Sequence, residues 1–530
     1  MLPKQFLLQV KYSFGKLNNP VSRILLFIGA IGSMMWSVYF SVVTIFIPYQ
    51  IEFREGTALV LSKILMGGGN PFSFENQPLG MNNYGLGYNL AVLPFAMLLG
   101  NTLVVHRTVT FSFILLAALV VFLSLNRSCK EPVLALACSA FVMTGLIANG
   151  GIGAFPSAMG TFLFYAAVLV PFARSFDRIG LCTSVLVTLA SFYTKPYFIL
   201  GFGIVASYLF LFVSKKRSAF FVAQFLFLFV ISFLIVRSVF PLYFINTIVG
   251  NISNTYRTFE HLVEQLVLLL LYFYPALILA LLVFFIRRLS KRERPSVSRE
   301  RGTLFNFVVW DQPLVAYSGD YIFYSLVCSL LAFLFILGPH VGTSMSYAYQ
   351  LVVPLFFYWL FQKISLDAKF AHVIALIILF NLYIFGQKTI SPDILRQEDP
   401  KKWMRLINTV ASTTNILNSP VVTSNVVELG LNPVDSGQTN YFYAVEPYQE
   451  HALVGPSYDA FQSDGFEYVQ FIDDSIKGQE FDLIMTTDGE PSFYHENLLS
   501  EYYSIDSKIV VNMPQTNRTW KIFLWRPLPK

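Results

Sequence analysis

The sequence predicts a polytopic α-helical membrane protein with a small α/β domain at its C-terminal end. Three observations lead to this prediction. The 530 residues are 55% hydrophobic and only 13% charged, about half of the charged fraction usual in soluble proteins. Apolar runs near the roughly 20 residues that cross a bilayer recur from Arg23 to about Gln387. Beyond residue 388, charges become frequent and short β-like runs replace the long apolar segments.

We expect eleven membrane spans, at about residues 23–49, 107–125, 132–149, 157–173, 180–194, 196–214, 219–239, 261–286, 321–338, 348–363 and 369–387. The first is too long for the core of a signal peptide and lacks a small-residue cleavage site, so we expect it to persist as a helix. Another apolar stretch, Leu86–Gly100, has only fifteen residues and contains Pro94. We therefore expect it to lie in, or dip into, the outer leaflet.

The basic residues predict the orientation. Twenty lysines and arginines fall on the side that holds the N-terminal tail, and on the other side the membrane part carries only Arg54, Lys63, Arg107, Lys195, Arg237 and Arg257. By the positive-inside rule the first side is cytoplasmic, so the 51–106 loop and everything after 388 lie outside. The net charge of +6 does not indicate nucleic-acid binding, because the basic residues cluster at helix ends. The four cysteines fall in or beside apolar segments and predict neither a disulfide framework nor a zinc site.

The domain boundaries follow from this pattern. Residues 1–387 form the transmembrane part, with an outer loop at 50–106, and residues 388–530 form the extracytoplasmic α/β domain. Within that domain four short runs are expected to be strands: "PVVTSNVV", "FDLIMTT", "KIVVNMP" and "WKIFLWRP".

The outer loop contains the first candidate site. Glu52 and Glu55 directly follow the first span, and they share a face if that stretch is helical. A carboxylate at a membrane interface costs desolvation energy unless it is paired or hydrated, so its presence suggests a function. Arg54 either holds an anion or pairs with a neighbouring glutamate. The Gly-, Asn- and Tyr-rich remainder, with Tyr84 and Tyr88, suits a polyhydroxylated ligand or forms an ordinary irregular loop.

Several stretches carry a resemblance when they are taken in order. They are "EFREGTALVLSKILMGGGNPF", "NNYGLGYNLAVLPFAMLLGNTLVVHRTVTFSFILLAALVVFLSL", "LASFYTKPYFIL", "GPHVGTSMSYAYQLVVPLF", "PVVTSNVVELGLNPVDSGQTNYFY" and "FDLIMTT". Together they resemble the GT-C superfamily of membrane glycosyltransferases, especially the family 39-like group with protein O-mannosyltransferases and aminoarabinose transferases. The resemblance implies transfer of a sugar from a polyprenyl-phosphate donor to an extracytoplasmic lipid, glycan or protein acceptor.

Two departures from the family pattern matter. The Asp-Glu pair after the first span reads Arg54-Glu55 here, so the role of general base passes to Glu55. A second acid often found near the third outer turn is missing from "NGGIGAFPSAMG". The acceptor class is therefore not carried over. No metal or cofactor is expected, because the lipid-linked sugar is itself the substrate.

Lys195 is the best-placed cation for the leaving phosphate, in a tight hairpin with Pro196 on the outer side; the alternative is a lysine that snorkels to the head groups. His340, Tyr347, Tyr349 and Gln350 begin a later span at the same depth. We expect them to hydrogen-bond sugar or phosphate, unless they form an aromatic belt with one interfacial histidine.

Two other function classes stay open. A polytopic lipid or sugar transporter or flippase would also need many spans, although paired halves with matching helix breaks are not visible. An inactive relative that only binds polyprenyl lipids is compatible with arginine at position 54. The resemblance and the cysteine usage favour the plasma (inner) membrane of a bacterium, with the N-terminus cytoplasmic.

Overall fold

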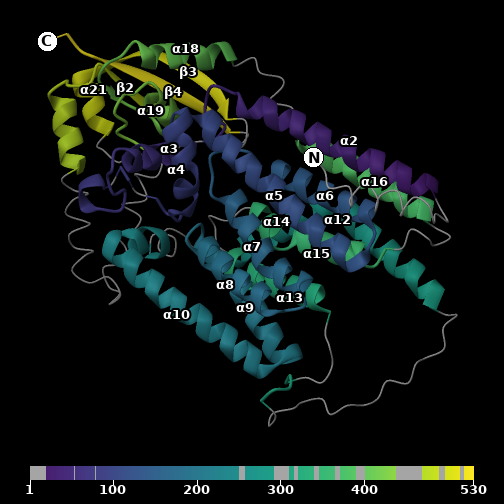
Figure 1. Cartoon of the computed structure of the whole chain (residues 1–530). Helices are drawn as coiled ribbons and strands as arrows, with labels where there is room; N and C mark the ends of the chain where they lie inside the picture. Colours follow the sequence, from purple (N-terminus) through teal and green to yellow (C-terminus); the bar gives the residue numbers. More distant parts are fainter. Residues whose placement is uncertain are drawn as a thin grey trace.

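A computed structural model describes residues 20–52, 54–77, 79–80, 82–249, 257–291, 310–314, 320–339, 345–364, 371–389, 400–436, 468–488, 496–513 and 518–529. Most of these residues form a bundle of helices, and a small sheet with short helices sits at one end of it (Figure 1). The outer loop, with α3 (Glu55–Met66) and α4 (Gly87–Leu99), lies between the bundle and the sheet (Figure 1).

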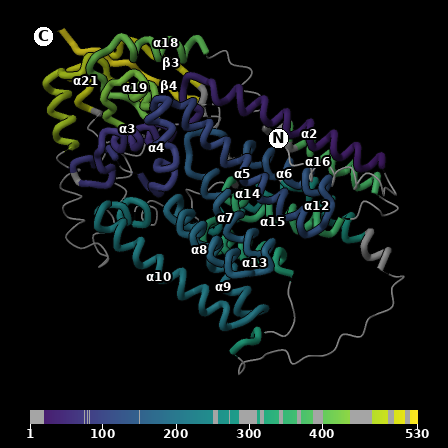
Figure 2. Tube along the Cα trace, viewed as in Figure 1, coloured from purple at the N-terminus to yellow at the C-terminus, as the bar shows by residue number. Residues whose placement is uncertain are grey.

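The helical bundle agrees with the expected segments. Its helices are α2 (Pro20–Ile45), α5 (Leu103–Cys129), α6 (Pro132–Gly150), α7 (Ser157–Ala173), α8 (Arg178–Phe192), α9 (Leu200–Tyr208), α10 (Lys215–Val239), α12 (Phe259–Lys291), α13 (Tyr321–Ala332), α14 (Met345–Leu351), α15 (Val353–Phe361) and α16 (Ala371–Thr389). Each of the eleven expected segments falls on one of these helices or on a run of two or three adjoining helical elements. Helices α2 and α16 run side by side, and α10 lies on the opposite flank (Figure 2).

Four helical stretches in the described part of the chain are long and apolar enough to cross a membrane, namely Pro20–Ile45, Leu103–Cys129, Pro196–Val213 and Lys215–Val239. A fifth is the bent pair Phe259–Leu271 and Phe273–Phe285, whose halves meet at 65°. Pro275 explains this bend, because it has no amide for the carbonyl of Leu271. The other apolar helices are shorter. The chain is therefore a membrane protein with several apolar helices, and the full count of eleven spans stays a prediction.

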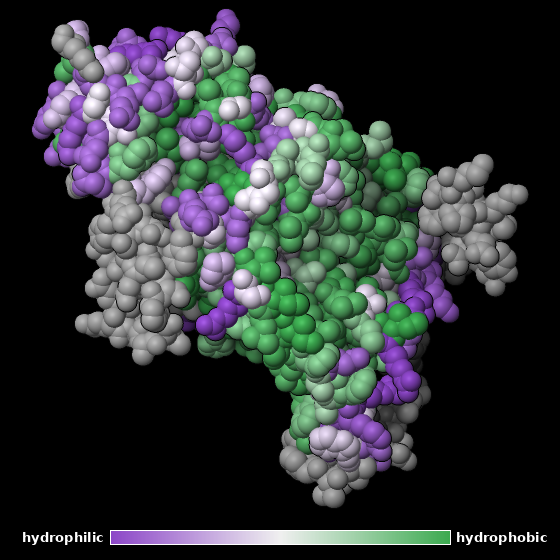
Figure 3. Space-filling model, turned by 60° about the vertical axis from the view of Figure 1, so that its left-hand side comes forward, coloured by the Kyte–Doolittle hydropathy of each residue, from purple (hydrophilic) through white to green (hydrophobic). Residues whose placement is uncertain are grey.

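The surface pattern agrees with a bilayer around the bundle. Hydrophobic residues form a broad, nearly continuous surface over the helical body, whereas hydrophilic residues gather over the sheet at one end (Figure 3). On α10, large apolar side chains such as Phe227, Leu234 and Ile235 are exposed. Exposing such a surface to water would cost free energy, whereas exposing it to lipid does not.

The short helix expected at Leu86–Gly100 is confirmed as α4. Its 13 residues rise by about 20 Å, less than the roughly 30 Å of the hydrocarbon core. One face buries Tyr88, Asn89 and Val92, while the end of the helix exposes Leu98 and Leu99. Its length alone therefore argues against a full span, and its position in the outer leaflet stays a prediction.

The C-terminal part forms a mixed four-stranded sheet in the order β1-β2-β4-β3. Its elements are α18 (Pro400–Ala411), β1 (Ile416–Leu417), η6 (Pro420–Val422), α19 (Thr423–Glu428), β2 (Leu483–Thr487), η8 (Glu496–Leu498), α21 (Leu499–Tyr502), β3 (Tyr503–Met513) and β4 (Arg518–Pro527). Strands β1 and β2 are parallel, and the other two pairs are antiparallel. Helix α18 packs Trp403, Leu406 and Val410 into the core that the sheet shares with the loop.

Three of the four expected strands are confirmed, and the prediction for "PVVTSNVV" is wrong. That stretch forms η6 and then α19. The Ser419 hydroxyl accepts from the Val421 amide, and Pro420 occupies the first helical position, where proline is favoured. Val422 and Val426, four residues apart, are both buried on one side of the helical segment. Packing here overrides the β preference of valine.

The sheet domain is joined closely to the outer loop. Tyr49 stacks on Trp403 with ring centroids 4.7 Å apart. The Gln50 side chain donates to the Pro420 carbonyl and accepts from the Ser424 amide. Helix α19 packs on α3, so residues after 400 form part of the wall around the loop.

Candidate functional site

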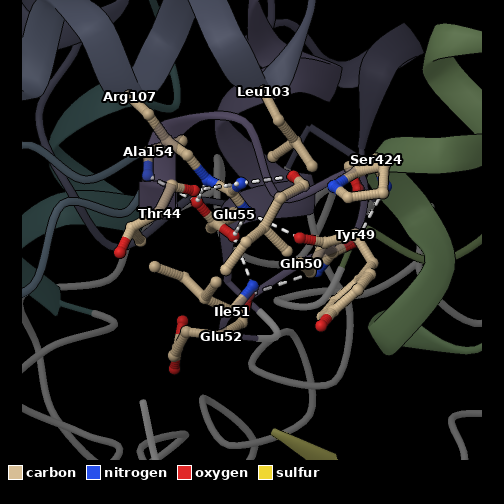
Figure 4. Close-up of polar contacts among 12 residues, drawn as sticks. Thr44, Tyr49, Gln50, Ile51, Glu52, Glu55, Leu103, Arg107, Ala154 and Ser424 are labelled. Atoms are coloured by element: carbon tan, nitrogen blue, oxygen red, sulfur yellow. Dashed lines mark hydrogen bonds and ion pairs between the residues drawn. The ribbon is translucent and has the colours of Figure 1, made fainter. Parts of the chain in front are cut away.

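Glu55 is the first residue of α3, and its carboxylate has no exposure. One oxygen accepts from Arg107 Nε at 2.9 Å and from the Ala154 amide at 2.9 Å. The other accepts from Arg107 Nη2 and from the Ile51 amide, both at 2.7 Å. Figure 4 shows Glu55 in the middle of this cluster. Four donors thus share its two oxygens.

Arg107 lies one turn into α5 and reaches the end of α2. Its Nη1 donates to the carbonyls of Thr44 and Ile47, and its Nη2 donates to that of Tyr49. The last carbonyls of a helix have no partner within the helix, so a guanidinium placed there satisfies them. Through Arg107, the Glu55 carboxylate connects α2, α3 and α5. The sequence predicted Arg107 only as an orientation signal.

Glu52 and Arg54 form a second pair. Glu52 has no exposure and accepts from Arg54 Nε at 2.6 Å and from the Arg54 amide at 2.8 Å. Arg54 Nη1 donates to the Tyr84 hydroxyl at 2.8 Å. Burial raises the pKa of Glu52, and the Arg54 charge opposes this shift. Helix α3 begins at Glu55, so Glu52 precedes it, and the two carboxylates face different arginines.

Lys195 lies in the turn between α8 and η2 (Pro196–Ile199), and it is only 4% exposed. Its backbone is extended and the helical turn begins at Pro196, as expected for a residue before proline. Nζ donates to the Ser157 hydroxyl at 2.8 Å. It also lies 4.4 Å from the ring centroid of Tyr84 and 5.4 Å from that of Tyr347, within cation–π distance.

The charge of Lys195 has little compensation. Within the described ranges, no carboxylate oxygen lies at ion-pair distance from its Nζ. The pKa of Lys195 is lowered to about 7, chiefly by burial and also by the Arg54 charge, while the Glu52 charge opposes the shift. A buried ammonium held by one hydroxyl and aromatic faces is well suited to receive an anion.

Backbone hydrogen bonds of the glycine-rich part of the loop hold Tyr84 beside this lysine. The amides of Gly85 and Gly87 donate to the carbonyls of Thr194 and Tyr193, one and two residues before Lys195. A side chain on Gly85 would place its Cβ 1.9 Å from the Tyr193 oxygen, so only glycine permits this approach. A narrow cleft next to this contact is lined by Arg54, Thr57, Ala58, Asn82, Tyr84, Gly85, Tyr88, Asn89, Ala154, Phe155 and Pro156.

The structure brings five of the predicted site residues into one cluster: Arg54, Tyr84, Lys195, Tyr347 and Gln350. Gln350 joins it through Tyr197, whose hydroxyl donates to the Gln350 side chain at 2.7 Å and whose ring centroid lies 5.8 Å from Lys195 Nζ. Sequence reasoning missed Ser157, although its stretch "NGGIGAFPSAMG" was examined for a carboxylate.

Two predicted site residues bond to backbone carbonyls outside this cluster, Tyr88 and Tyr349. Tyr88 lines the cleft, but its hydroxyl donates to the His106 carbonyl within the protein. Tyr349 is buried in the helical core, where its hydroxyl donates to the Phe141 carbonyl. His340 lies outside the described residues.

The fold and the cluster define a class: a helical membrane protein with a buried acid–base cluster at one end of its bundle, beneath a small sheet domain. The chain matches no protein-family model, no curated protein and no solved structure. The resemblance to GT-C glycosyltransferases therefore stays a prediction from the sequence.

Proposed function

We propose that this protein is a membrane glycosyltransferase that moves a sugar from a polyprenyl-phosphate donor to an acceptor outside the cytoplasm. The observation that supports it most is that two cations meet at Tyr84: Arg54 donates to its hydroxyl, and the buried Lys195 ammonium lies 4.4 Å from its ring centroid. Lipid phosphate is an anion delivered at the membrane surface, and a buried lysine beside a half-buried arginine suits it. Tyr84, Tyr347 and Gln350 supply hydroxyl and amide groups for the sugar.

The reaction requires no group beyond those of the chain and its substrates. An acceptor hydroxyl attacks the anomeric carbon, the bond from that carbon to the phosphate oxygen breaks, and the electron pair leaves with the lipid phosphate. Lys195 and Arg54 stabilise the charge that develops there. A carboxylate takes the acceptor proton, which contributes roughly 10²–10⁴-fold.

The test measures transfer of radiolabelled sugar from a panel of undecaprenyl-phosphate hexoses and pentoses to extractable acceptors, in membranes that contain the protein. Wild-type membranes should transfer label, and Lys195→Ala should lose donor binding. Lys508→Ala is the matched control, because its ammonium also lies over an aromatic ring, that of Phe523, but on the exposed side of the sheet domain. The control should behave as wild type.

Two results would overturn the proposal. The first is wild-type protein that transfers no sugar from any donor of the panel. The second is movement of a fluorescent polyprenyl phosphate across proteoliposomes without transfer, which would establish the transporter or flippase instead.

A further inference from the structure

The two glutamates of the outer loop differ in what their oxygens can still accept. A carboxylate offers about four lone-pair sites, and the four donors on Glu55 use all of them. A base must offer a lone pair to the proton that it takes. Glu55 would have to break a buried contact with Arg107, Ile51 or Ala154 before it could accept a proton.

Glu52 has two donors, and both belong to Arg54. It also belongs to the cationic cluster, because its partner Arg54 donates to the Tyr84 hydroxyl and the Tyr84 ring lies 4.4 Å from Lys195 Nζ. In Figure 4 Glu52 lies at the edge of the contact cluster, away from the Arg107 guanidinium. Glu52 therefore combines spare acceptor capacity with proximity to the cations that we assign to the phosphate.

From this geometry we propose that Glu52, rather than Glu55, takes the acceptor proton, and that Glu55 is a positioning residue. This inference rests on the proposed transferase function. When the donor phosphate binds Arg54 and Lys195, it competes with Glu52 for the Arg54 guanidinium. The freed carboxylate oxygen then faces the acceptor hydroxyl, whose oxygen bonds to the anomeric carbon while the proton passes to Glu52.

The exchange at Arg54 also makes Glu52 a stronger base. Burial raises the pKa of Glu52, whereas the charge and hydrogen bonds of Arg54 lower it. Moving the guanidinium to the phosphate removes the lowering influence. The carboxylate thus becomes more basic when the donor is in place, which favours binding of the donor first and the acceptor second.

The experiment compares Glu52→Gln, Glu52→Asp and Glu55→Gln with the control Glu75→Gln, whose side chain is exposed in η1 (Phe74–Asn76). Binding of undecaprenyl phosphate, thermal unfolding and sugar transfer are measured for each variant. Glu52→Gln should lower kcat by about a hundredfold or more, and it should remove the acidic limb of the pH–rate profile. Its affinity for undecaprenyl phosphate should be unchanged or tighter, because a negative charge beside the phosphate is gone.

A purely structural role for Glu52 gives a different pattern. If Glu52 only holds Arg54, then Glu52→Gln should weaken binding of undecaprenyl phosphate and leave the pH profile unchanged; this result would overturn the inference. Glu52→Asp keeps the charge but withdraws the carboxylate by one methylene. Its kcat should fall at unchanged melting temperature, and wild-type turnover would count against the inference.

The failure of the inference can be told from the failure of the function. Suppose that the wild type transfers sugar and Glu52→Gln stays active. If Glu55→Gln then folds stably and binds donor but has lost turnover, Glu55 is the base. Absence of transfer by the wild type with the whole donor panel would overturn both proposals.

Discussion

Glu55 and Arg107 lie 52 positions apart and meet through two hydrogen bonds of 2.9 and 2.7 Å, with neither side chain exposed. Each member has further partners: two amides for the carboxylate, and for the guanidinium three carbonyls, one in the last turn of α2 and two just after it. Removal of one partner leaves the other charge buried without its counterion, which is the costly case for a buried ion pair.

Glu55→Gln should therefore destabilise the protein by about 3–5 kcal/mol, the usual cost of breaking a buried pair from one side. Thermal unfolding in detergent measures the loss. The double variant Glu55→Gln with Arg107→Met should recover part of it, because no uncompensated charge remains. An unfolding curve of Glu55→Gln that overlies the wild-type curve would show that the pair contributes little.

Binding of a donor phosphate should depend on the protonation of Lys195. Its pKa is lowered to about 7, so the ammonium is present below that pH and is lost as the pH rises through it. Affinity for undecaprenyl-phosphate glucose, a phosphodiester of constant charge, should fall above about pH 7 and approach a tenfold loss per pH unit. Lys195→Arg should bind without this dependence, since arginine stays charged. Equal affinity of the wild type at about pH 6 and about pH 8.5 would exclude Lys195 from the phosphate site.

Gly56→Ala should loosen the sheet domain from the outer loop. A Cβ at Gly56 would lie 2.5 Å from the Thr423 Cβ, in the contact between α3 and α19. Limited proteolysis should then cut the chain between the bundle and the sheet domain faster than in wild type. The matched control is Gly32→Ala, because its added Cβ would meet no neighbouring atom, and it should leave the digestion rate unchanged. Gly68→Ala is not suitable, because Gly68 has a positive φ of 76°.

Labelling with an impermeant maleimide should sort single cysteines by side, in a chain with its four own cysteines replaced. Ser73→Cys in the outer loop and Ser500→Cys in the sheet domain should react in intact cells. The exposed Ser128→Cys at the other end of α5 should react only after the membrane is opened. Labelling of both Ser73→Cys and Ser128→Cys in intact cells would overturn the eleven-span arrangement and make α4 a span.

The helical part of the fold could be predicted from the sequence because lipid imposes a length and an apolar composition on each crossing segment. The helix at Gly87–Leu99 and the strands Leu483–Thr487, Tyr503–Met513 and Arg518–Pro527 followed from similar local patterns. The stretch that became α19 did not, because valine-rich runs favour strands locally, and tertiary packing against α3 and the sheet core decides otherwise.

The candidate site could be predicted only in part. Tyr84 was predicted from the composition of the outer loop, and Lys195 from its place at the outer end of two spans. In the structure the Lys195 Nζ lies 4.4 Å from the ring centroid of Tyr84. A pair of Arg54 with a neighbouring glutamate was one alternative that the sequence left open, and the structure shows it with Glu52. The distant partner of Glu55 could not be derived, since charges in a loop give no information on which remote side chain each one meets. The one available signal was Arg107 itself, a charge one turn inside an apolar helix, which is costly unless it is satisfied.

The joining of the sheet domain to the outer loop has a consequence for biogenesis. Gln50 hydrogen-bonds to Pro420, 370 positions later, and Thr57 to Ser436, 379 positions later. During synthesis the loop beside the first helix emerges early, but the residues that complete its wall are translated last. In the orientation that we propose, the nascent loop waits outside the cytoplasm without these partners until the end of the chain has been translocated. The site would then mature only after that last step, and not when the helices insert.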